Sequence, residues 1–129
     1  MSGQQSDEDM GGGCLPVLDA QPLWVLTEQA GRAVAERFFN DYLDLLPARS
    51  ASIVAGLAAE DRGRTLDAVV SLRVTSAMAG ALQMEESSRA LERQLHVGDW
   101  SDAKTVREEL SRNILRIVSE VQRQGRLSR

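Results

Sequence analysis

The chain has 129 residues, a hydrophobic content of 43% and a net charge of -4 from 15 basic and 19 acidic side chains. This length supports one domain with a single core, and the acidic surplus is interspersed with basic residues, without the basic stripe that binding to a nucleic acid requires. No apolar run reaches the roughly 18 residues of a membrane span, so we expect neither a nucleic acid nor a membrane as a partner.

The chain has one cysteine and one histidine, Cys14 and His96. A single cysteine excludes an intramolecular disulfide framework, and these two residues are too few to build a zinc site of the usual ligand types. We therefore expect no metal and no other cofactor. The polar, acidic N-terminus lacks the basic and apolar regions of a secretory signal, so we expect a cytoplasmic protein.

Residues 1–17 contain glycines and acidic side chains without periodicity, which predicts a disordered tail. Asp19 is suited to cap a short amphipathic helix that ends near Gly31. Apolar residues then recur at helical spacing over a long segment, which Pro47 either kinks or locally breaks. The recurring residues are Val34, Phe38, Tyr42, Leu45, Leu46, Ile53 and Leu57.

The next helix starts after residues 61–63 and stops at Gly80, where a left-handed residue is expected at a helix C-terminus. A fourth helix closes at Gly98, and a fifth begins after Ser101 as its N-cap and ends before Gly125. Their apolar stripes consist of Met84, Ser87, Leu91 and Leu95, and of Val106, Leu110, Ile114, Ile117 and Val121.

No segment has the alternating pattern of a strand. The pattern therefore predicts an all-α fold, an antiparallel up-down four-helix bundle with an additional short N-terminal helix. The bundle is expected to span residues 18–122, followed by a frayed basic C-terminus at residues 123–129.

The third of these helices has two partly apolar faces. At about 100° per residue, one face holds Ala68, Leu72, Thr75, Ser76 and Ala79, and the other holds Leu66, Val70, Arg73, Val74 and Ala77. One interpretation is that the helix is central and buries both faces, with the Arg73 side chain reaching out to solvent. The other is that the second face is exposed and binds a partner, and periodicity alone leaves both open.

Residues 69–81, VVSLRVTSAMAGA, resemble the signature helix of histidine-containing phosphotransfer (HPt) domains, which reads approximately His-x-Leu-Lys-Gly-Ser-Ser-Ala-x-x-Gly-Ala. Leu72 matches the leucine and Arg73 stands for the lysine. The remaining matches are Thr75, Ser76, Ala77, Gly80 and Ala81. Segments 88–92 and 96–100 are similar to the next helix and loop of the family, so the resemblance covers residues 17–122. It implies an HPt-like helical bundle and a role in two-component phosphorelay signalling.

The resemblance also places Val70 at the position of the phosphorylated histidine. In that family the imidazole accepts a phosphoryl group from a receiver-domain aspartate, a step that needs a nitrogen lone pair, which valine lacks. Val74 replaces a small residue where the phosphoryl group needs space. Ser71 points about 100° away with no evident base, and His96 matches no phosphorylation position. We therefore expect no catalytic residue and no enzymatic activity.

The expected function is that of a pseudo-phosphotransfer protein, which binds a partner without accepting phosphate. In HPt domains the equivalent face docks a receiver domain through apolar contacts, and an exposed apolar patch with a polar rim is typical of a partner site. The resemblance assigns partner binding to Leu66, Val70, Arg73, Val74 and Ala77. The implied partner is a response-regulator receiver domain or a histidine-kinase-related protein.

Two alternatives stay open at this point. The same face could bury itself in a homodimer, which would make the chain a helical homo-oligomerisation or scaffold module unrelated to receivers. The chain could also be an active phosphotransfer protein that uses another nucleophile.

Overall fold

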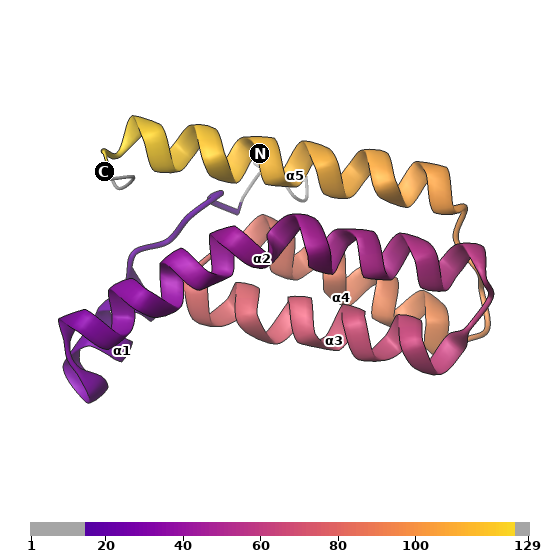
Figure 1. The fold of residues 1–129 in the computed structure, drawn as a ribbon, viewed down its shortest axis with the longest axis horizontal. Helices are drawn as coiled ribbons and strands as arrows, with labels where there is room; N and C mark the ends of the chain where they lie inside the picture. Colours follow the sequence, from indigo (N-terminus) through magenta and orange to yellow (C-terminus); the bar gives the residue numbers. More distant parts are fainter. Residues whose placement is uncertain (1–14, 126–129) are drawn as a thin grey trace, which may run out of the picture.

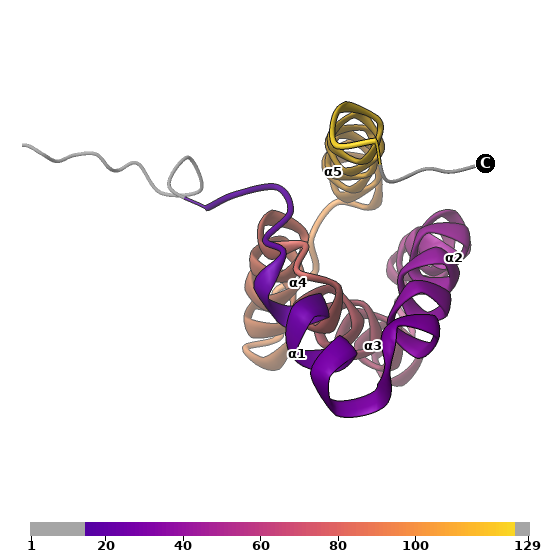
Figure 2. The same cartoon turned by 90° about the vertical axis from the view of Figure 1, so that its left-hand side faces the viewer.

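The computed structural model describes residues 15–125 and shows five helices in this part of the chain. They are α1 (Gln21–Ala30), α2 (Arg32–Ala58), α3 (Arg62–Ala79), α4 (Leu82–His96) and α5 (Ala103–Arg123). The four long helices, α2 to α5, run alternately up and down, and α1 lies at one end of the bundle (Figure 1, Figure 2). Residues 15–125 contain no strand, so the predicted all-α bundle with a short N-terminal helix is confirmed.

Asp61 and Gly80 determine where α3 begins and ends. At its start, the Asp61 side chain accepts a hydrogen bond from the backbone N–H of Arg64 at 3.2 Å, as an N-cap does. At its end, Gly80 has a φ of 82°, and the N–H of Ala81 donates to the Ser76 carbonyl at 2.9 Å. A Cβ at Gly80 would also lie 2.0 Å from the Asp19 carbonyl oxygen, so only glycine fits there.

Two predicted helix caps need correction, and of the two alternatives at Pro47, a kink or a break, the break is excluded. Helix α1 is preceded by Ala20, and Asp19 instead accepts a hydrogen bond from the N–H of Gln21 at 3.0 Å. Asp102 rather than Ser101 caps α5, since its carboxylate accepts from the N–H of Thr105 at 3.0 Å. Helix α2 continues through Pro47 without a break. The tertiary contacts of a long helix outweigh the one hydrogen bond that proline removes.

One core fills the bundle, and its largest fully buried side chains come from α2 to α5. They include Tyr42, Leu46, Ile53, Leu72, Met84, Leu95 and Ile117. Three residues of the predicted apolar stripes are not buried, although the next residue in the chain is. Val34 and Leu45 are exposed, and Ser87 is half-buried. The buried neighbours are Ala35, Leu46 and Ser88. A shift of one residue turns a side chain by about 100° away from the core.

Helices α2 and α3 approach each other closely at two levels. The Tyr42 hydroxyl and the Ser76 Oγ lie 2.7 Å apart in the core. Near the other end, a Cβ at Gly56 would lie 2.4 Å from Oγ1 of Thr65, so the glycine allows the two backbones to approach. These contacts hold α3 with one stripe pressed against the core and leave its opposite side for the surface.

The described chain begins at Leu15, whose carbonyl accepts a hydrogen bond from Nε2 of Gln83 at 2.9 Å, and Val17 packs against the core. Residues 15–17, assigned to the tail by sequence, therefore lie against the bundle. The rest of the predicted tail and residues 126–129 lie outside the described residues, so those two predictions stay predictions. Among the described helices, none is both long and apolar enough to cross a membrane.

Candidate docking face

The buried stripe of α3 consists of Thr65, Val69, Leu72, Ser76 and Ala79. Sequence reasoning placed Ala68 and Thr75 in this stripe, but both are only half-buried, whereas Val69 has no exposed surface. The stripe is therefore rotated toward Val69, because a β-branched side chain fills the space between helices that the adjacent Ala68 would leave empty.

The five residues predicted to bind a partner share the other side of α3, and we call them the docking face: Leu66, Val70, Arg73, Val74 and Ala77. Val74 lies opposite the buried stripe and is 42% exposed. Val70, Arg73 and Ala77 are half-buried, and half-buried Leu66 packs against the edge of the core. The interpretation that α3 buries both of its faces is therefore wrong.

Met78 extends the apolar part of this face and was missed by sequence reasoning. It is 43% exposed and lies one turn beyond Val74, which in turn lies one turn beyond Val70. The i, i+4 spacing of these three residues was the available signal. Together they form an apolar strip along the outer side of α3, as is typical of a contact surface.

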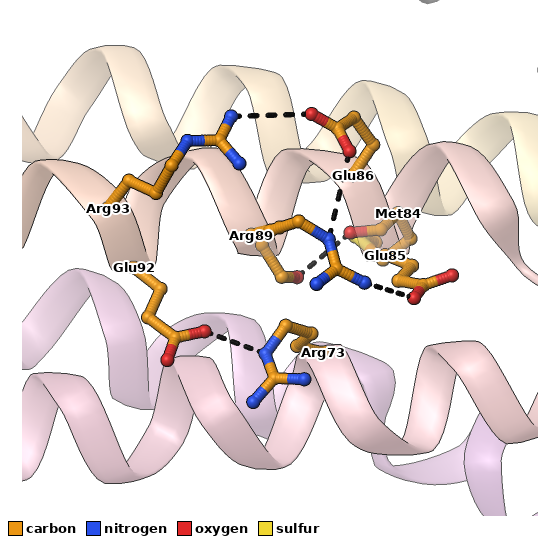
Figure 3. Close-up of polar contacts among 8 residues, drawn as sticks. Arg73, Met84, Glu85, Glu86, Arg89, Glu92 and Arg93 are labelled. Carbon is orange, nitrogen blue, oxygen red and sulfur yellow. Dashed lines mark hydrogen bonds and ion pairs between the residues drawn. The ribbon is translucent and has the colours of Figure 1, made fainter.

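Arg73 forms the polar edge of the docking face toward α4. Its Nε donates a hydrogen bond to Oε1 of Glu92 at 2.6 Å, and Figure 3 shows the carboxylate of Glu92 reaching down from α4 to the guanidinium. The two side chains are only 26% and 20% exposed. Arg73 therefore does not extend freely into solvent but joins the two helices by a charge-assisted contact.

Glu92 also faces His96, the last residue of α4. The Nε2 atom of His96 lies 3.7 Å from Oε2 of Glu92, an ion pair when the imidazole is protonated. Sequence reasoning placed this histidine in the turn between helices and away from the site. The structure instead brings Arg73, Glu92 and His96 together on one edge, which no spacing in the sequence indicated because α3 and α4 contribute separately.

The outer surface of α4 continues this pattern of paired charges. Arg89 donates to Glu85 at 2.6 Å and lies 3.9 Å from Glu86, which also pairs with Arg93 at 3.4 Å (Figure 3). The edge of the site along α4 thus consists of arginines that already have carboxylate partners. Such surface pairs contribute little to stability, but they decide which charges a partner meets.

Valine side chains at positions 70 and 74 offer apolar contacts at the docking face. The Val70 side chain has no lone pair, and Val74 adds bulk directly beside it. Within residues 15–125, no group of three or more histidine, cysteine, aspartate or glutamate residues is arranged to hold a metal ion. The buried Tyr42 hydroxyl lies behind α3 and has its pKa raised to about 12 by burial, so it stays protonated at neutral pH.

Comparison with known proteins places this arrangement in a defined class of folds. The histidine-containing phosphotransfer protein B (HptB) of Pseudomonas aeruginosa PAO1 superposes with a TM-score of 0.72 at 21% identity, covering 88% of this chain and 98% of the other. The HPt domain of a sensor hybrid histidine kinase from Shewanella gives a TM-score of 0.68 at 19% identity, covering 88% and 97%. No protein-family model and no curated protein matches the chain.

The chain therefore has the fold of histidine-containing phosphotransfer domains over nearly the whole length of these two proteins. This agrees with the fold that the resemblance of residues 69–81 implies.

Proposed function

We propose that this protein is a pseudo-phosphotransfer module of phosphorelay signalling, which binds a receiver domain or a histidine-kinase-related protein through the docking face without accepting phosphate at position 70. We further propose that it acts in the cytoplasm and has no enzymatic activity. The observation that carries the proposal is the apolar strip on α3, which begins at half-buried Val70, where the resemblance places the phosphorylated histidine, and continues through exposed Val74 and Met78.

The fold supports the signalling context of this proposal. The phosphotransfer protein HptB of Pseudomonas aeruginosa and the HPt domain of a Shewanella hybrid histidine kinase share this arrangement. In this chain the same bundle carries an apolar strip on α3. A receiver could dock against that strip. A fold alone does not assign a function, so the support comes from the fold and the strip together.

The valine at position 70 supports the part of the proposal that the protein accepts no phosphate there. Transfer from an aspartyl phosphate requires a neutral nitrogen nucleophile at the centre of the interface. Valine supplies apolar area instead, and burying a valine side chain is favourable by about 1.5–3 kcal/mol. A protein of this kind would sequester a receiver, compete with active phosphotransfer partners or serve as a scaffold.

A binding screen tests the proposal. The purified protein is titrated with the receiver domains of its own organism, each with and without beryllofluoride as the aspartyl-phosphate mimic. We expect one or a few receivers to bind, and Val70→Asp and Val74→Asp each to weaken that binding by about tenfold or more, because a charge is desolvated in the contact.

Leu115→Asp is the matched control for this screen. Leu115 is 67% exposed on α5, on another helix of the bundle, so its replacement introduces the same charge away from the docking face. Binding that is lost in both α3 variants and kept in the control supports the proposal. Absence of binding to every receiver, or equal loss in all three variants, contradicts it.

The homodimer alternative is tested with the same purified protein. Light scattering after size-exclusion chromatography gives the mass of the unmodified protein and of Val70→Asp. A dimer that the substitution dissociates would assign the docking face to self-association instead of a receiver.

A further inference from the structure

We propose that Glu92 is a specificity-determining residue of the docking face, which disfavours phosphoryl groups there by placing a carboxylate charge against Nε of Arg73. This inference rests on the proposed function in so far as position 70 is the centre of the face. It goes further in naming a second obstacle to phosphoryl chemistry, on α4, which is independent of the missing histidine.

Two contacts between α3 and α4 locate this obstacle beside Val70. Nε of Arg62, at the start of α3, donates to the Leu95 carbonyl at 3.2 Å, and Arg73 binds Glu92. Since the two helices run antiparallel, Val70 lies on α3 between these two anchor points. The last turn of α4, which carries both Glu92 and His96, therefore lies alongside the stretch of α3 that contains position 70.

Arg73 is the arginine nearest to Val70 along α3, and it is already paired with a carboxylate. One oxygen of Glu92 takes the Nε–H of Arg73 at 2.6 Å, and the other faces His96. Both members of the ion pair are mostly shielded from solvent, so their attraction is weakly screened. A phosphoryl oxygen would have to displace this carboxylate or lie next to its negative charge.

The two arginines on the outer surface of α4 are also paired with carboxylates. Arg89 contacts Glu85 and Glu86, and Arg93 contacts Glu86 (Figure 3). Arginine recognises phosphate through its fork of N–H donors, and a carboxylate bound to that fork takes one of the donors and offsets the positive charge. The α4 edge of the docking face therefore favours a partner surface without a phosphoryl group.

Phosphoramidate, a small phosphoryl donor, tests this inference without any receiver. In the reaction an imidazole nitrogen attacks phosphorus, the P–N bond of the donor breaks, ammonia leaves with the imidazole proton, and a new N–P bond forms. The Val70→His variant supplies the nucleophile. The double variant Val70→His with Glu92→Gln also removes the negative charge beside Arg73 while keeping the side-chain shape.

We expect the double variant to form phosphohistidine at position 70 at least about tenfold faster than Val70→His alone, as measured by intact mass and located by tandem mass spectrometry. Val70→His with Glu108→Gln is the matched control, since it removes an equal charge from an exposed position on α5, away from Arg73. The unmodified protein reports any background on His96, which is the single histidine of the chain. Equal rates with and without Glu92→Gln, or no phosphohistidine in the double variant, would overturn the inference.

A second measurement tests the inference without the double variants, in case these do not fold. The Nε–H resonance of Arg73 is followed by NMR during titration with inorganic phosphate, in the unmodified protein and in Glu92→Gln. We expect a saturable shift in the variant and none in the unmodified protein. A saturable shift in the unmodified protein, or none in the variant, contradicts the role assigned to Glu92, whatever the outcome of the receiver screen.

Discussion

The hydroxyl of Tyr42 on α2 lies 2.7 Å from Oγ of Ser76 on α3, and both side chains are fully buried. Ser76 is one of the residues that match the phosphotransfer signature, and its contact shows that this match has a packing role. The hydrogen bond joins the buried stripe of α3 to α2, on the side of α3 that faces away from exposed Val74.

Replacement of Tyr42 by phenylalanine removes this contact. Because the Ser76 hydroxyl is then left buried without the tyrosine, we expect the free energy of unfolding to fall by about 1–2 kcal/mol in urea denaturation. The double variant Tyr42→Phe with Ser76→Ala should lose less unfolding free energy than the sum of the losses in the two single variants. Full additivity would show that the two hydroxyls do not stabilise each other.

The pH dependence of stability follows from the raised pKa of Tyr42. Burial raises the pKa of this hydroxyl from 10.0 to about 12 in the folded protein. Below the pKa of the unfolded chain the tyrosine is neutral in both states, so its contribution to stability is complete. Between these two values only the unfolded chain ionises, so stability falls as the pH rises, by roughly 1.4 kcal/mol per pH unit, and levels off above the folded pKa.

Tyr42 is the single tyrosine of the chain, so phenolate absorbance in a pH titration reports it alone. The loss of stability in this alkaline range should be absent in Tyr42→Phe, which is the control for other titrating groups. A phenolate transition near the ordinary value in the folded protein would contradict the burial of this side chain.

Gly80→Ala tests the turn that ends α3. The substitution forces a left-handed alanine and places its Cβ against the Asp19 carbonyl, so we expect a loss of more than about 2 kcal/mol in chemical denaturation. Gly98→Ala is the matched control. Gly98 has a φ of 79° but nothing within 4 Å of its Cβ position, so only the backbone cost of about 1–2 kcal/mol applies. Equal losses in both variants would show that Asp19 does not approach Gly80.

The adjacent valines Val69 and Val70 separate the core from the docking face. Val69→Asp buries an unpaired carboxylate and should prevent folding or cost more than about 4 kcal/mol, whereas Val70→Asp should cost about 1 kcal/mol. Thermal unfolding followed by circular dichroism compares them directly. Similar losses in both would place Val70 in the core and remove the basis for a partner site there.

Sequence reasoning predicted the bundle because its long helices carry apolar residues at regular spacing and end at glycines such as Gly80. It was less accurate where neighbouring residues have similar properties. Asp102 and Ser101 are both good N-caps, and Ala68 and Val69 are both apolar, so only tertiary packing decides which residue takes each role.

The polar edge of the site could not be predicted because it joins residues 19 positions apart on two helices. The residues of the signature also differ in burial. Its matches Leu72, Ser76 and Gly80 are buried. Val70 and the neighbouring match Arg73 are half-buried, and Val74 is exposed. Buried and exposed positions therefore alternate within the signature, as the turn of a helix at the edge of a core requires.

Chemical-shift mapping shows directly whether a receiver binds on the α3 docking face. Isotope-labelled protein is titrated with a receiver that the screen identifies. We expect the perturbed amides to centre on Val70 and Val74 and to extend to Glu92. Perturbations centred instead on the groove between α2 and α5, which Val54 and Leu115 line, would contradict binding on this face.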